Sequence, residues 1–247
     1  MLFNNSDYYI YGTHTISSIL LNQPNRAIQL LIQDDFKKDL DKMKILQMAG
    51  SLGVNVKYLA KRKFDEQFKD NIARQKICMK VREFTYLNLQ YILDNKPKLC
   101  VVLDGIEDPG NLGRAIRSAF ALGANVVILP KDRSAKITSA VEQSAVGTVS
   151  KIAIVRVSSI NSMFEKLKKI GYWIIGTSDN CKQDCWNYKF EVPLVIAIGN
   201  EGNGLRSGVI KNCDQLVQIP MSELGISLNA ADALAIILYE ILRQNLQ

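Results

Sequence analysis

The stretch Val195-Ile-Ala-Ile-Gly-Asn-Glu-Gly-Asn-Gly-Leu205 joins a hydrophobic run to a turn whose glycines enclose one acid, Glu201. The apolar residues 194–198 predict a buried strand. The glycines remove side chains where the backbone must turn tightly or approach a ligand. Glu201 is therefore expected at the carboxyl end of a strand, the edge of an open α/β sheet where ligands bind. Taken by itself, Glu201 could equally be a helix cap.

From residue 99 onward, predicted strands and helices alternate. Strands are expected at 99–103, 125–129, 152–156, 172–176, 194–198 and 215–219, with helices at about 111–122, 137–144, 159–170, 206–211 and 228–244. Such alternation predicts a largely parallel sheet with helices on both faces.

The first ninety-odd residues predict a small α/β unit. Strands are expected at 27–32, 54–60 and 76–83, a helix at 38–50, and a further helix where apolar residues recur between Ile16 and Leu20. A turn-rich patch at 94–97 marks the boundary, so we expect domains at 1–95 and 96–247. The basic stretch 61–63 could contact phosphate or be ordinary solvated surface.

The composition is that of a globular protein, with 47% hydrophobic and 22% charged residues among 247. No run reaches the ~20 apolar residues of a membrane span, and the N-terminus lacks a secretory pattern, so a cytoplasmic protein is expected. The cysteines are scattered and the single histidine, His14, is distant from them, so neither disulfides nor a metal site are predicted. The net charge of +7 fits a nucleic-acid partner or an ordinary lysine-rich surface equally well.

Two further segments place polar residues after predicted strands. In residues 103–119, Asn111 can cap a helix, and Arg114 and Arg117 lie three apart on one helix face, a corner suited to RNA phosphate. The alternative is that Asn111 is only a cap and Arg117 only a surface ion-pair partner. In residues 218–240, Ser227 or Asn229 can cap an apolar helix, and the preceding loop is long enough to surround a small ligand. The glycine spacing matches neither a P-loop nor a dinucleotide fingerprint, which disfavours a generic nucleotide-binding protein.

Read together, the segments 108–117, 199–205 and 219–229 resemble the three motifs of the SpoU (TrmH-type) RNA 2′-O-ribose methyltransferases. The segment Tyr11-Gly-Thr-His14 and the helix after it resemble the small RNA-binding domain of the family's ribosomal-RNA branch. Where that branch usually has His-Gln-Gly, this chain has Arg74-Gln75-Lys76. The resemblance implies a C-terminal domain with a deep trefoil knot, S-adenosylmethionine as cofactor, and a homodimer with sites near the subunit interface.

The resemblance also implies roles for individual residues. Cofactor contacts are expected from Gly199, Ile219 and Leu228, and catalytic roles from Asn111, Arg117, Glu201, Ser227 and Asn229. Because a guanidinium is essentially always protonated, Arg117 is expected to position phosphate and stabilise a developing alkoxide rather than act as a base. Glu201 and Asn111 are expected to orient Arg117 and the ribose.

The predicted function is S-adenosylmethionine-dependent methylation of a ribose 2′-OH in structured RNA, with a guanosine of large-subunit (23S) ribosomal RNA as the target that the resemblance favours. One alternative is a transfer-RNA 2′-O-methyltransferase of the same family. The other is a non-catalytic RNA-binding assembly factor, which would have no need of all five polar residues. No membrane and no metal are expected as partners.

Overall fold

The computed structural model describes residues 7–35, 39–68, 70–222 and 227–245. The chain falls into two units: an N-terminal unit formed by Met1–Thr85 with Ile137–Lys151, and a C-terminal unit formed by Tyr86–Lys136 with Ile152–Gln247. This division differs from the expected 1–95 and 96–247, because residues 137–151 pack with the first part of the chain. The helix at 89–95 also belongs to the second unit, since its Ile92 is buried in that unit's core.

A parallel six-stranded sheet forms the C-terminal unit, with strand order β10-β8-β9-β5-β6-β7. Its elements are α5 (Leu89–Asn95), β5 (Leu99–Leu103), α6 (Pro109–Ala121), β6 (Val126–Pro130), β7 (Ala153–Val157), α8 (Ile160–Lys168), β8 (Trp173–Thr177), β9 (Leu194–Ile198), α9 (Ser207–Ile210), β10 (Gln215–Val217) and α10 (Ala230–Asn245), with a short 3₁₀ turn at Cys185–Asn187. The expected parallel sheet is confirmed, and strand bounds differ from expectation by two residues or fewer.

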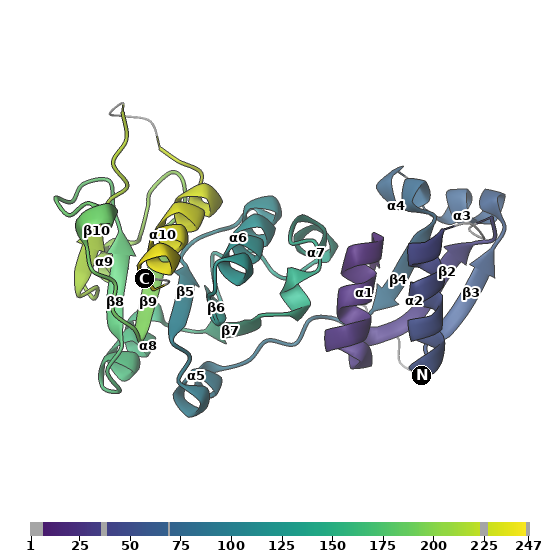
Figure 1. The fold of residues 1–247 in the computed structure, drawn as a ribbon, viewed down its shortest axis with the longest axis horizontal. Helices are drawn as coiled ribbons and strands as arrows, with labels where there is room; N and C mark the ends of the chain where they lie inside the picture. Colours follow the sequence, from purple (N-terminus) through teal and green to yellow (C-terminus); the bar gives the residue numbers. More distant parts are fainter. Residues whose placement is uncertain (1–6, 36–38, 69, 223–226, 246–247) are drawn as a thin grey trace. The chain divides into compact units, whose positions relative to one another are not determined.

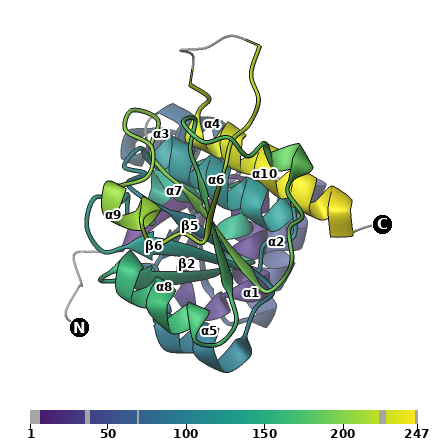
Figure 2. The ribbon, with the colours of Figure 1, turned by 90° about the vertical axis from the view of Figure 1, so that its left-hand side faces the viewer.

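Helices cover both faces of this sheet (Figure 2). Helices α5, α8 and α9 pack against one face through Ile92, Phe164 and Val209. Helices α6 and α10 pack against each other on the opposite face. Strands β5, β6 and β9 are buried along their whole length, which explains why they read as unbroken apolar runs rather than as alternating ones.

The N-terminal unit is built on a mixed four-stranded sheet of order β1-β4-β2-β3, in which only β2 and β3 are parallel. Figure 1 labels three of these strands, β2, β3 and β4, with helices α1 and α2 beside them. Its elements are β1 (Tyr8–Tyr11), α1 (Thr13–Asn22), η1 (Pro24–Arg26), β2 (Ala27–Gln33), α2 (Leu40–Ser51), β3 (Asn55–Leu59), α3 (Lys61–Gln67), α4 (Asp70–Gln75), β4 (Ile77–Val81), α7 (Ser139–Ser144) and η2 (Thr148–Ser150). Alternate residues of β2 face opposite cores: Leu30 packs with α1 and α2, and Leu31 packs with Phe64 of α3.

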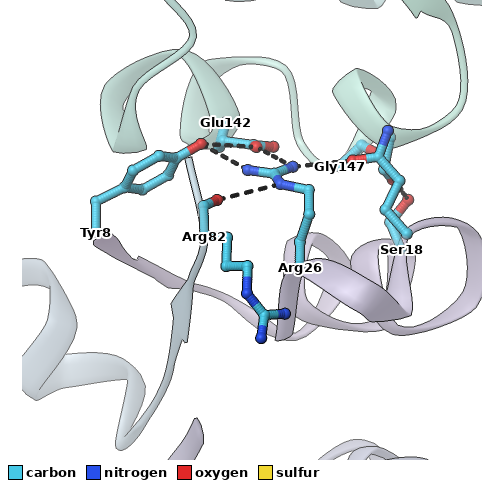
Figure 3. Close-up of polar contacts among 8 residues, drawn as sticks. Tyr8, Ser18, Arg26, Arg82, Glu142 and Gly147 are labelled. Atoms are coloured by element: carbon cyan, nitrogen blue, oxygen red, sulfur yellow. Dashed lines mark hydrogen bonds and ion pairs between the residues drawn. The ribbon is translucent and has the colours of Figure 1, made fainter. Parts of the chain in front are cut away.

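The segment 137–151 joins this unit through buried polar contacts (Figure 3). The Arg26 guanidinium forms a 2.9 Å ion pair with Glu142, whose side chain is fully buried. Arg26 also donates to the Tyr8 hydroxyl at 2.7 Å, and that hydroxyl donates to Glu142 at 3.3 Å. The Ser18 hydroxyl donates to the Gly147 carbonyl at 2.6 Å. Buried charges of this kind persist only when paired, so the segment is fixed within the N-terminal unit.

Among the residues that the structure describes, no helix is both long enough and apolar enough to cross a membrane.

Candidate active site

The three motif segments meet at one edge of the C-terminal sheet. Strands β5 and β9 are parallel neighbours in the register Leu103 opposite Ile198, so the segments that follow them begin side by side. The third segment follows β10, which points the same way. Residues far apart in the chain are thus gathered at the carboxyl ends of parallel strands.

The turn after β9 is closed by its own backbone. Asn200 and Gly204 exchange two backbone hydrogen bonds of 3.2 and 3.0 Å. The Asn200 side-chain carbonyl accepts from the amides of Gly202 and Asn203 at 3.1 and 2.7 Å. A Cβ atom at Gly199 would overlap the backbone of Gly204 and Leu205. Glycine at 199 is therefore required for the turn to fold back on itself, which is the first of the two reasons for glycine that the sequence suggested, a tight turn or a close approach of ligand.

Asp108, rather than Asn111, caps helix α6. Its carboxylate accepts from the Asn111 backbone amide at 2.6 Å, and Pro109 occupies the first turn. The expectation that Asn111 starts the helix is wrong by about two residues. The consequence is functional, because Asn111 has a side chain left free for other partners.

Four side chains form what we call the polar cluster: Asn111, Arg114, Glu201 and Asn229. The Asn111 amide donates to the Glu201 carboxylate, and Arg114 donates to the Asn111 carbonyl. Asn229 donates to Asn111 Oδ1 at 3.0 Å and to Glu201 Oε1 at 2.5 Å. Asn229 Oδ1 accepts from the Ala231 backbone amide at 2.9 Å, so this residue also caps α10. The structure thus brings three of the five predicted catalytic residues into direct contact.

Arg117 and Ser227 lie outside these contacts. Arg117 is exposed on α6, and in the described part of the chain it forms no hydrogen bond or ion pair. The expected pairing of Arg117 with Glu201 is therefore absent, and Arg114 is the arginine that joins the cluster. Ser227 is exposed and lines the cavity described next.

A cavity of about 430 Å³ lies beside the polar cluster. All three predicted cofactor residues line it, Gly199, Ile219 and Leu228, together with Glu201 and Ser227. Sequence reasoning missed residues 177–180, which also line it. Thr177 is the last residue of β8 and residues 178–180 follow it, so the strand-end rule that located the other segments applies to them as well.

The donor set suits an organic ligand rather than a metal ion. Within the described residues, no group of three or more His, Cys, Asp or Glu side chains could hold a metal. The cavity walls combine apolar side chains such as Val217 and Ile219 with the backbone of the β9 turn. Small-molecule sites are typically built in this way, with a few polar groups that fix the ligand's orientation.

Comparison with known proteins identifies the family. Residues 98–239 match the SpoU rRNA Methylase family, and residues 9–87 match a domain described as RNA 2′-O ribose methyltransferase substrate binding. The chain is 35% identical to the 23S rRNA (guanosine-2′-O-)-methyltransferase RlmB of Haemophilus influenzae, over 96% of this chain and 98% of that protein. The RlmB of Photobacterium profundum is 34% identical over 97% and 98%.

Among solved structures, the fold is similar to that of the SpoU methyltransferase AviRb from Streptomyces viridochromogenes, crystallised in complex with AdoMet. The TM-score is 0.82 at 26% identity, over 98% of this chain and 91% of that one. The matched segments include all three motifs that form the cavity and the polar cluster. The chain therefore belongs to the SpoU rRNA methylase family.

Proposed function

We propose that this protein transfers a methyl group from S-adenosylmethionine to the ribose 2′-OH of a guanosine in 23S ribosomal RNA. The observation that carries the proposal is the cavity beside the polar cluster, at the strand edge where the three family motifs meet. The relatives named 23S rRNA (guanosine-2′-O-)-methyltransferase match almost the whole chain, including the N-terminal unit.

The cavity fits S-adenosylmethionine in size and in chemical character. Its volume of about 430 Å³ lies within the range of small-molecule sites. Ile219 and Leu228 would provide apolar contact for the adenine ring, and the backbone at Gly199 would provide hydrogen-bonding groups. When bound, the cofactor would supply a methyl group activated by its positive sulfur.

The polar residues would then align and stabilise the reacting ribose. Methyl transfer forms a bond between the 2′-oxygen and the methyl carbon, breaks the carbon–sulfur bond in line with it, and releases the hydroxyl proton. Of the five predicted catalytic residues, only Glu201 carries a group that could accept this proton, since Arg117 stays protonated. Arg117, exposed and unpaired within the described chain, is available to hold RNA phosphate and to stabilise negative charge on the oxygen.

Exchange of Arg117 tests the proposed division of roles. Arg117→Ala should lower methyl transfer at least 100-fold, the size of effect seen when a transition-state donor is removed. Its affinity for S-adenosylmethionine, measured by calorimetric titration, should stay within about threefold, because Arg117 does not line the cavity. Arg133→Ala, an exposed arginine in the same unit, serves as the control.

The target is identified by mapping 2′-O-methyl groups in ribosomal and transfer RNA from cells with and without the gene. Loss of one guanosine methyl in 23S RNA supports the proposal. Loss of a transfer-RNA methyl would reassign the substrate within the family. Failure of the purified chain to bind S-adenosylmethionine would instead favour the non-catalytic assembly factor.

Finer features of the family complete the proposal. We assign RNA substrate binding to the N-terminal unit and methyl transfer to the C-terminal unit, in place of the expected division between residues 95 and 96, and we propose a deep trefoil knot in the C-terminal unit. A cytoplasmic homodimer is proposed, with α6 and α10 at its interface. These helices carry three large hydrophobic side chains that are exposed in the single chain, as expected of an interface: Phe120 at 39%, Ile236 at 41% and Tyr239 at 60%. Ile236→Glu should shift the sedimentation coefficient to that of a monomer.

A further inference from the structure

The Asn111 side chain lies at the centre of the polar cluster and has one defined orientation. Two donors point at its carbonyl oxygen: the Arg114 guanidinium and the Asn229 amide, the latter at 3.0 Å. Its own NH₂ group donates to the Glu201 carboxylate. All three contacts are consistent with only one of the two ways in which an amide can be turned.

Arg114 is the donor that cannot change its role. A guanidinium has five N–H donors, no acceptor, and stays protonated at every accessible pH. If the Asn111 amide turned over, its NH₂ group would face Arg114, and its carbonyl would face the Glu201 carboxylate. Both new contacts would be repulsive, so Arg114 holds the Asn111 NH₂ group toward Glu201.

The backbone leaves room for this arrangement. Arg114 lies three residues after Asn111 on α6, a spacing at which helical side chains meet. A Cβ at Gly110 would lie 3.1 Å from the Asp108 cap oxygen and 3.5 Å from Arg114 Nη1. Glycine at 110 therefore keeps the helix cap uncrowded, while the distance to the guanidinium is an ordinary contact.

The two arginines on this face of α6 thus have different surroundings. Arg114 is engaged with Asn111, whereas Arg117 has no partner among the described residues. We infer that Arg114 is a positioning residue for methyl transfer, which acts by orienting the Asn111 amide toward Glu201 rather than by binding RNA. This inference rests on the proposed function, because its main readout is the methyl-transfer rate.

Three substitutions of Arg114 separate the hydrogen-bond donor from the charge. Arg114→Ala should lower the single-turnover rate at saturating RNA about tenfold, with the KM for RNA within twofold of wild type. Arg114→Gln removes the charge but keeps a side-chain donor that can reach an amide three residues away. Arg114→Lys keeps both the donor and the positive charge. Each should recover at least half of the lost rate on a logarithmic scale. Thermal melting checks that all three variants are folded.

A double-mutant cycle tests whether Arg114 acts through Asn111. In an Asn111→Ala background, Arg114→Ala should change the rate less than twofold, because the group that it orients has been removed. An additive loss would overturn the inference. So would an increase in KM with a weaker salt dependence of RNA binding, which is the signature of a lost phosphate contact.

A readout that needs no activity keeps the inference separate from the proposed function. The Asn111 side-chain NH₂ signals, assigned through Asn111→Ala, should shift or broaden in ¹⁵N spectra of Arg114→Ala. They should stay unchanged in Arg117→Ala, which removes the same charge one turn away. Unchanged signals in Arg114→Ala would refute the orienting role. A wild-type chain that transfers no methyl group would refute the proposed function alone.

Discussion

Replacing Arg26 by methionine would leave a fully buried carboxylate, Glu142, without its cation. The two side chains form a 2.9 Å ion pair and are 7% and 0% exposed, so solvent cannot compensate for the loss. Removing one partner of a buried pair costs about 3–5 kcal/mol. For an unfolding transition with a urea dependence of about 1–3 kcal/mol/M, a loss of 3 kcal/mol lowers the midpoint by about 1–3 M.

The loss of stability in Arg26→Met should depend on pH, and the pKa of Glu142 determines the direction of that dependence. Burial raises the pKa of Glu142 above its ordinary value of 4.5, and attraction to Arg26 partly opposes that effect. Without Arg26, the pKa should rise further. A carboxyl group with a raised folded-state pKa makes its full contribution to the free energy of unfolding below about pH 4.5, and that contribution is lost as the pH rises through the folded-state pKa. The penalty of Arg26→Met should therefore shrink on acidification and be largest at neutral pH.

The assay is urea unfolding followed by two signals. Both tryptophans, Trp173 and Trp186, belong to the C-terminal unit, so their fluorescence reports on that unit. Circular dichroism reports on both units, and only its N-terminal component should shift. Adding Glu142→Gln to Arg26→Met removes the buried charge and should recover much of the loss. A penalty below about 1 kcal/mol at pH 7, or a double variant no more stable than the single one, would refute the reasoning.

Two glycine substitutions test backbone requirements. Gly199→Ala forces a Cβ into the backbone of Gly204 and should weaken S-adenosylmethionine binding at least tenfold in calorimetric titration. The control, Gly202→Ala, should bind as wild type, because its Cβ would meet nothing closer than 3.9 Å. Equal affinities of the two variants would contradict the role of Gly199. Gly147 has φ +82°, and a Cβ added there would lie only 2.9 Å from Ser18 Cβ. Gly147→Ala should therefore destabilise the N-terminal unit by at least about 1 kcal/mol more than Gly171→Ala destabilises the C-terminal unit. Gly171 has a similar φ of +91° and no neighbour within 4 Å, so its substitution costs only the left-handed strain of about 1–2 kcal/mol.

The C-terminal sheet could be predicted because its strands are buried on both faces. Strands β5 and β9 have the expected bounds, because an unbroken apolar run of five residues between turns is typical of a strand that is buried on both faces. The short helices α3 and α5 were not expected. Each is only seven residues long, and a helix of that length depends on tertiary packing, here through Phe64 and Ile92, rather than on a repeated local pattern.

The site could be predicted down to its segments but not its contacts. The motifs located the cavity, and Gly199, Ile219 and Leu228 line it. The choice between Arg114 and Arg117 as partner of the cluster could not be read from spacing, because both arginines are on one helix face. It depends on Asp108 capping the helix, which frees the Asn111 side chain to meet Arg114.

The contacts of segment 137–151 limit how this protein can be recombined with its relatives. The chain passes between the two units at residues 85–86, 136–137 and 151–152, so no single cut separates them. A chimaera that exchanges only residues 1–85 would place foreign partners opposite Glu142 and Gly147, which contact Arg26 and Ser18. The exchangeable module is therefore discontinuous in sequence, and its two pieces must be inherited together.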